Sequence, residues 1–178
     1  MAQIKVLDKT FETYLSAEKI QNRITEIANE INKDYAGKKP VFLAILNGSF
    51  MFASDLFKQI TIEAEITFVK LASYEGTTTT GKVKQAIGLN TDLKDRHVII
   101  IEDIVDTGHT MAQFLPELEK SNPASIKLAV FLHKPEATLV PITIDYCCFS
   151  IPNKFVLGYG LDYDQLGRNL PELYQLCE

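Results

Sequence analysis

Carboxylates, hydroxyls and a glycine gather in one short part of this chain. Glu102, Asp103 and Asp106 come first, and residues 107–110 follow with the sequence TGHT. The hydroxyls, the glycine and the backbone N–H groups of residues 107–110 suit a phosphate, which the preceding carboxylates would repel. Carboxylates can bind sugar hydroxyls, hold a divalent cation or move a proton. These residues therefore predict a site for a phosphorylated sugar handled together with Mg²⁺.

The flanking residues predict the elements that position this site. Residues 98–101 are consecutive β-branched and apolar, which is typical of a strand buried on both faces of a parallel sheet. Apolar residues at helical spacing follow, at Met111, Phe114, Leu115 and Leu118. The order is strand, acidic turn, glycine-bearing loop and helix. In open α/β sheets, ligands bind beyond the carboxyl ends of the strands, where this loop lies.

A second strand, loop and helix unit precedes the first. Residues 16–35 have helical periodicity with Ser16 as N-cap, and residues 41–46 form another apolar strand. The loop Asn47, Gly48 and Ser49 then leads into a helical pattern over residues 50–60. This loop could present amides to a second phosphate, or it could be only a turn with a helix cap.

Further strands are expected at residues 64–73 and 126–132, and two short ones between residues 142 and 170. A polar tract from Ser73 to Lys84 predicts a mobile loop. Lys134 follows the strand at 126–132 and should lie at the same sheet edge as the acids. Pro116 falls inside a helical pattern and is expected to kink or break that helix.

Bulk composition limits the class of protein. A length of 178 residues with 46% hydrophobic residues suits one α/β domain, and nothing resembles a linker. The net charge of −5 argues against a nucleic-acid-binding or acidic-membrane-binding surface. The chain has neither a signal-peptide pattern nor an apolar run near the roughly 20 residues of a membrane span, which predicts a cytoplasmic location. Three cysteines without metal-ligand spacing are expected to be reduced thiols.

Residues 98–111, VIIIEDIVDTGHTM, resemble the signature of the type I phosphoribosyltransferases, in the form found in the branch that uses hypoxanthine and guanine. The resemblance extends from the strand at Val41 to Arg168. It implies an α/β type I phosphoribosyltransferase fold, in which helices flank a central, mainly parallel twisted sheet. It also implies a small hood, a flexible active-site loop and a single domain over residues 1–178.

The resemblance also implies a reaction. A ring nitrogen of the purine attacks C1 of 5-phosphoribosyl-1-pyrophosphate and displaces pyrophosphate. Asp106 would be the general acid or base at the purine N7, and residues 107–110 would hold the 5-phosphate. Glu102 and Asp103 would orient the ribose hydroxyls and, with them, Mg²⁺. In the family the loop at 47–49 binds pyrophosphate, often contains a cis peptide, and usually carries lysine where this chain has Asn47.

Other residues take roles from the same resemblance. Ser73 and Tyr74 would begin an arm that closes over the site, and Lys134 would donate to the exocyclic oxygen of a 6-oxopurine. In the predicted hood, Phe155 would stack on the base and the backbone of Val156 would pair with its edge. Asp162 would be a second Mg²⁺ ligand or a base contact, and Arg168 would grip pyrophosphate. The predicted substrate-binding residues are Asn47, Gly48, Ser49, Ser73, Tyr74, Glu102, Asp103, Asp106, Thr107, Gly108, His109, Thr110, Lys134, Phe155, Val156, Asp162 and Arg168, and the predicted metal ligands are Glu102, Asp103 and Asp162.

The favoured prediction is a purine salvage enzyme that converts hypoxanthine, and also guanine, to the nucleotide as a dimer or tetramer. A xanthine-guanine specialist with the same chemistry remains an alternative, because all three bases carry the 6-oxo group. A non-catalytic regulator that binds nucleic acid is a third, although the acidic chain shows no basic face. A dinucleotide-binding domain would need G-x-G-x-x-G after the first strand, and the chain lacks it there.

Overall fold

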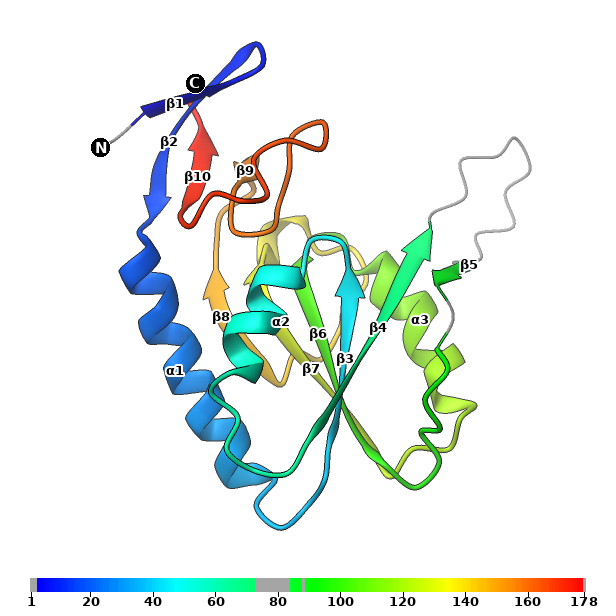
Figure 1. Cartoon of the computed structure of the whole chain (residues 1–178). Helices are drawn as coiled ribbons and strands as arrows, with labels where there is room; N and C mark the ends of the chain where they lie inside the picture. The colour runs from blue at the N-terminus through cyan, green and yellow to red at the C-terminus, as the bar shows by residue number, and fades with distance from the viewer. Residues whose placement is uncertain (1–2, 73–83, 88, 178) are drawn as a thin grey trace, which may run out of the picture.

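A computed structural model describes residues 3–72, 84–87 and 89–177 of the chain (Figure 1). Its centre is a sheet in the order β5-β4-β3-β6-β7-β8. All neighbouring pairs are parallel except β4 and β5. The strands are β3 (Val41–Leu46), β4 (Glu65–Ala72), β5 (Lys84–Ile87), β6 (His97–Val105), β7 (Ser125–His133) and β8 (Tyr146–Ser150). The expected mainly parallel sheet is confirmed.

A smaller antiparallel sheet in the order β1-β2-β10-β9 forms the hood. Its strands are β1 (Gln3–Val6), β2 (Lys9–Leu15), β9 (Val156–Leu157) and β10 (Leu173–Leu176). Figure 1 shows this sheet beyond the end of the main sheet toward which the arrows of β3 and β8 point. Phe11, Leu157 and Tyr174 make a separate small core there. Both end regions of the chain therefore contribute strands to the hood.

The strands of the main sheet are apolar on both sides because helices cover both faces. Along β3, Phe42 and Ala44 pack toward one core and Val41, Leu43 and Ile45 toward the other. α1 (Ala17–Asp34) and α2 (Phe50–Phe57) cover the first face, and α3 (His109–Glu119) covers the second (Figure 1). The Ser16 hydroxyl accepts from the Lys19 backbone N–H, so the predicted N-cap of α1 is confirmed.

Three boundaries differ from the sequence-based expectation. β6 continues through Glu102 and Asp103 to Val105, because pairing with β7 holds the backbone extended, so these acids lie on the strand rather than in a turn. α2 ends at Phe57 and does not reach residue 60. α3 continues past Pro116 to Glu119, so the proline does not break it. Pro116 removes one backbone hydrogen bond near the end of the helix, and α3 continues for three residues beyond it.

Within the described residues, no helix is both long enough and apolar enough to span a membrane. The short 3₁₀ helix η1 (Pro135–Ala137) follows β7 and completes the helical elements that the structure describes.

Candidate active site

The carboxyl ends of β3, β6 and β7 are adjacent because these strands are neighbours in the parallel sheet. Each end carries one of the segments singled out from the sequence. The loop at residues 47–49 follows β3, the acids lie at the end of β6, and Lys134 follows β7. The topology therefore brings the three segments to one edge of the sheet.

Asp106 and Lys134 form a charged pair at this edge. Lys134 Nζ lies 3.4 Å from Asp106 Oδ2, and the backbone N–H of Lys134 donates to the carbonyl of Val105. The Lys134 side chain is only 9% exposed, whereas that of Asp106 is 46% exposed. The ammonium group is therefore held in place while the carboxylate faces solvent, where it can exchange a proton with a ligand.

Residues 107–110 line a pocket of about 250 Å³ together with Glu102, residues 104–106 and Met111. His109 is the exception, since its side chain is exposed and does not line the pocket. Gly108 has φ of 84°, and a Cβ there would lie 2.3 Å from the Val140 carbonyl oxygen. The pocket sits at the beginning of α3, where free N–H groups and the helix dipole favour an anion.

Glu102 and Asp103 are adjacent acids in a poorly solvated environment. Burial, followed by the negative charge of Asp103, raises the pKa of Glu102 well above its usual value. Burial also raises the pKa of Asp103, although the N–H of Ile104, which donates to Asp103 Oδ1, opposes that shift. Glu102 Oε2 is buried and has no hydrogen-bond partner among the described groups. An oxygen of this kind is available to a cation or a sugar hydroxyl.

The loop after β3 packs directly on Asp103. The Leu46-Asn47 peptide, whose isomer the sequence left open, is cis. Gly48 is buried, and a Cβ on it would lie 1.6 Å from Asp103 Oδ2, so only glycine fits. The Ser49 side chain points inward, and its hydroxyl donates to the carbonyl of Ile45. Ser49 therefore does not offer its hydroxyl to a ligand here, while Asn47 is exposed.

The hood reaches the same loop through Gly160. A Cβ on Gly160 would lie 2.0 Å from the carbonyl oxygen of Gly48. Arg168 donates to the Gly160 carbonyl at 2.9 Å and pairs with Asp162 at 2.7 Å. Burial raises the pKa of Asp103, and the positive charge of Arg168 opposes part of that rise. Arg168 therefore lies near the acids of β6, as its predicted role requires.

Comparison with known proteins assigns this arrangement to a family. Residues 11–164 match the family model described as a phosphoribosyl transferase domain. The chain belongs to the phosphoribosyl transferase family. A relative from Streptococcus pneumoniae named hypoxanthine-guanine phosphoribosyltransferase is 41% identical over 165 residues, which are 92% of each chain. One of the same name from Lactococcus lactis is 43% identical over 169 residues, covering 94% of this chain and 92% of the relative.

Solved structures agree with these sequence relatives. A crystal structure of a hypoxanthine phosphoribosyltransferase from Staphylococcus aureus superposes with a TM-score of 0.88 at 40% identity, covering 93% of this chain and 91% of that one. A hypoxanthine-guanine phosphoribosyltransferase from Bacillus anthracis gives the same TM-score at 35% identity, covering 94% and 97%. The type I phosphoribosyltransferase fold expected from the signature is confirmed.

In this phosphoribosyl transferase the predicted base-stacking ring has the exposure that stacking requires. Phe155 is 45% exposed, and its ring centroid lies 6.1 Å from that of Phe11 and 5.8 Å from that of Tyr163. The two neighbouring rings hold Phe155 in position and leave part of it free. Val156 is buried in β9, so only its backbone could meet a base. Ser73 and Tyr74, with the predicted mobile loop, lie outside the described residues.

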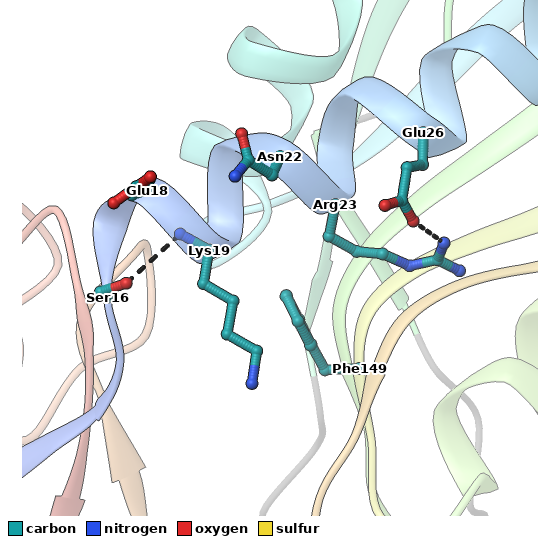
Figure 2. A pocket seen from close by; sticks show the side chains of 7 residues that line it. All are labelled: Ser16, Glu18, Lys19, Asn22, Arg23, Glu26 and Phe149. Carbon is teal, nitrogen blue, oxygen red and sulfur yellow. Dashed lines mark hydrogen bonds and ion pairs between the residues drawn. The ribbon is translucent and has the colours of Figure 1, made fainter.

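A second hollow, of about 360 Å³, lies between α1 and β8 (Figure 2). The Arg23 guanidinium beside it is already engaged, since it donates to the carbonyls of Cys147 and Cys148 and pairs with Glu26. The remaining lining mixes Lys19 with acidic and amide side chains around Phe149. Apart from Phe149, these lining residues come from Ser16 and α1 and none lies at the carboxyl end of a strand, so we assign the chemistry to the sheet edge.

Two sets of contacts at the site were missed from the sequence. Thr138 contacts both the Asp106 and the Lys134 carbonyls, at 3.1 and 3.0 Å. Tyr159 donates to Asp55 at 2.6 Å and so ties the hood to α2. Neither residue lies in a periodic pattern, so the sequence offered no signal for them.

Proposed function

We propose that this phosphoribosyl transferase moves the 5-phosphoribosyl group from 5-phosphoribosyl-1-pyrophosphate to hypoxanthine and guanine, releasing pyrophosphate. The observation that carries this proposal is the pair of Asp106 and Lys134, 3.4 Å apart, beside the pocket at residues 107–110. A 6-oxopurine presents an oxygen to a cation and the neighbouring N7 to an acid or base. The pair offers both groups at hydrogen-bonding separation. The names of the relatives support the same choice of bases.

The roles of the residues follow from their environment. Lys134, nearly buried, donates to the 6-oxo group and so fixes the orientation of the base. Asp106, which is exposed, then exchanges the proton at N7 as C1 of the ribose is attacked. Thr107, Gly108 and Thr110 hold the 5-phosphate at the start of α3. Phe155 covers the face of the base and helps to exclude water.

The acids of β6 fit Mg²⁺ as a partner of the substrate. Mg²⁺ is usually bound by one or two carboxylates together with phosphate oxygens and water, and Glu102 Oε2 is a buried oxygen that lacks a partner. Among the described residues no group of three or more acidic, histidine or cysteine side chains could hold a metal. Glu102 and Asp103 would therefore hold the ion only together with substrate oxygens. Asp162 could become a further ligand once its ion pair with Arg168 is broken. When bound, the ion would neutralise charge on pyrophosphate.

We further propose that the enzyme works in the cytoplasm as a dimer or tetramer. Its cysteines are free thiols, a state that the reducing cytoplasm maintains.

Phe50 and Phe68 are each more than two-fifths exposed, and such aromatic surface is often covered by another copy of the chain. Light scattering coupled to gel filtration measures the oligomer directly, and a monomer at micromolar concentration would contradict this proposal.

A steady-state assay tests the activity. The purified protein receives 5-phosphoribosyl-1-pyrophosphate and Mg²⁺ with hypoxanthine, guanine, xanthine or adenine in parallel. We expect turnover of hypoxanthine and guanine, none of adenine, and loss of activity in EDTA. Preference for xanthine over hypoxanthine would instead identify a xanthine-guanine specialist. If the protein binds the sugar pyrophosphate but turns over none of the bases, the proposed enzymatic activity is wrong. A non-catalytic regulator would then be the favoured function.

A further inference from the structure

Thr138 connects the two residues that would handle the base. It follows η1, directly after the loop that begins at Lys134. Its Oγ1 lies 3.0 Å from the carbonyl oxygen of Lys134, 3.1 Å from that of Asp106 and 3.2 Å from Nε2 of His133. One hydroxyl thus contacts the backbones of both residues of the charged pair and one imidazole.

The donors and acceptors around the Thr138 hydroxyl can be matched to one another. A threonine hydroxyl has one proton to donate and accepts through its oxygen. Both nearby carbonyls can only accept, so the hydroxyl proton is shared between them. With the hydroxyl proton directed to the carbonyls, the oxygen can accept from His133, so the ring donates from Nε2 to Thr138 Oγ1. His133 therefore orients the hydroxyl toward Asp106 and Lys134.

The backbone around this contact shows why the side chain matters. Three consecutive carbonyls at the end of β6 receive hydrogen bonds from the segment after β7. The carbonyl of Val105 accepts from the Lys134 N–H, and that of Thr107 accepts from the N–H groups of Leu139 and Val140. The middle carbonyl, that of Asp106, accepts from the Thr138 side chain. The residue with the exposed carboxylate is therefore the one whose backbone is held by a side chain.

We propose that Thr138, oriented by His133, is a positioning residue that sets the geometry of Asp106 relative to Lys134. This inference rests on the proposed function, because it assigns the pair to base recognition. Thr138 acts through these two residues and does not touch the substrate itself. The backbone bonds to Thr107 do not depend on its hydroxyl, so the phosphate pocket should keep its shape without it.

The experiment compares Thr138→Val, which keeps the shape and removes the hydroxyl, with Thr138→Ser, which keeps the hydroxyl. We expect Thr138→Val to raise KM for hypoxanthine about threefold and to lower kcat about threefold, so that kcat/KM falls about tenfold, as the loss of one hydrogen bond predicts. KM for 5-phosphoribosyl-1-pyrophosphate should change less than about twofold, because the backbone bonds to Thr107 remain. Thr138→Ser should restore both parameters. His133→Phe should shift KM for the base in the same direction, and it carries the test if Thr138→Val fails to fold.

Calorimetry separates this inference from the proposed function, since it needs no turnover. The probes are inosine 5-monophosphate and ribose 5-phosphate, which differ only in the base. Weaker binding of the nucleotide alone by Thr138→Val supports the positioning role. Equal weakening of both probes, or no change in either, overturns it. A wild-type protein that binds inosine 5-monophosphate but turns over no base overturns the proposed enzyme and leaves the calorimetric comparison valid.

Discussion

Arg168 Nη2 lies 2.7 Å from Asp162 Oδ1, so two residues assigned to pyrophosphate and Mg²⁺ are paired with each other. The second carboxylate oxygen of Asp162 accepts from the Gln165 N–H. Arg168 also donates to Gly160, whose backbone lies against Gly48. In the proposed site, pyrophosphate would compete with Asp162 for the guanidinium. An arginine suits this exchange because its planar fork can serve two acceptors at once.

Replacing Arg168 by lysine should weaken the binding of 5-phosphoribosyl-1-pyrophosphate. Lysine keeps the charge but cannot pair with both Asp162 and phosphate oxygens, so we expect KM to rise about tenfold, the effect of one hydrogen bond to a charged group. Arg96→Lys is the matched control, because Arg96 pairs with Glu65 and precedes β6 at the opposite edge of the sheet. If the two variants had equal KM values for 5-phosphoribosyl-1-pyrophosphate, Arg168 would not be a pyrophosphate-binding residue.

Asp106→Asn should lower kcat far more than it weakens binding of the sugar pyrophosphate. The amide keeps the shape of the carboxylate but cannot accept the N7 proton, and general base catalysis typically contributes about 10²-fold to 10⁴-fold. Rates at saturating substrate give kcat, and calorimetry gives the affinity. Asp95→Asn is the control, at an exposed position with φ of 58° that asparagine tolerates. An unchanged kcat in Asp106→Asn would exclude the acid or base role.

Gly48→Ala should abolish activity, because the new methyl group would overlap Asp103 Oδ2. Displacing this carboxylate disturbs the acids of β6, and overpacking typically costs about 1–3 kcal/mol of stability. Gly37→Ala is the comparison, since Gly37 has a positive φ, of 73°, but a Cβ on it would meet only open space. We expect Gly37→Ala to lose some thermal stability through backbone strain and to keep full activity. A normal kcat in Gly48→Ala would show that activity does not depend on the position of the Asp103 carboxylate.

Glu102→Gln should stabilise the protein at neutral pH while lowering its activity. The pKa of Glu102 is raised in the folded protein, so the native state binds this proton more tightly than the unfolded chain does. Stability is then lost as the pH rises above the ordinary value of about 4.5, and glutamine avoids that loss.

Thermal unfolding across pH checks this trade-off. The melting temperature of Glu102→Gln should exceed that of the wild type at pH 8, and the difference should shrink as the pH falls toward 4.5. Glu119→Gln, at the exposed end of α3, controls for the loss of one negative charge. A variant that melts below the wild type at pH 8 would refute the assignment of a costly buried charge.

The sequence predicted the parts of the fold that depend on local pattern. Apolar runs located β3 and β7 to within one residue, and Ser16 was correctly placed as the cap of α1. The antiparallel partners in the hood were missed, because β1 and β10 are only four residues long and β10 pairs with β2 across almost the whole chain. The alternation of Ile4 and Val6 in β1 and the apolar Phe11 and Leu15 on one face of β2 could have suggested strands there.

The site was predictable in its acids and in Lys134, because residue type and position after a strand carry that information. Contacts that depend on the direction of a side chain could not be predicted from the sequence. The inward turn of the Ser49 hydroxyl and the pairing of Asp162 with Arg168 both arise from tertiary packing, which no spacing in the sequence encodes. The hydroxyl of Thr138 belongs to the same class.

The hood sheet has a consequence for how the protein is made. β10 (Leu173–Leu176) is an inner strand, between β2 and β9, so β9 has no partner strand and β2 has only β1 until residues 173–176 are synthesised. The strands of the main sheet are all translated earlier, and early regions generally fold first during synthesis. Phe155 is packed against Phe11 in this sheet. A nascent chain can therefore assemble the edge of the main sheet that carries Asp106 and Lys134 first, and it gains the hood only after β10 has been synthesised.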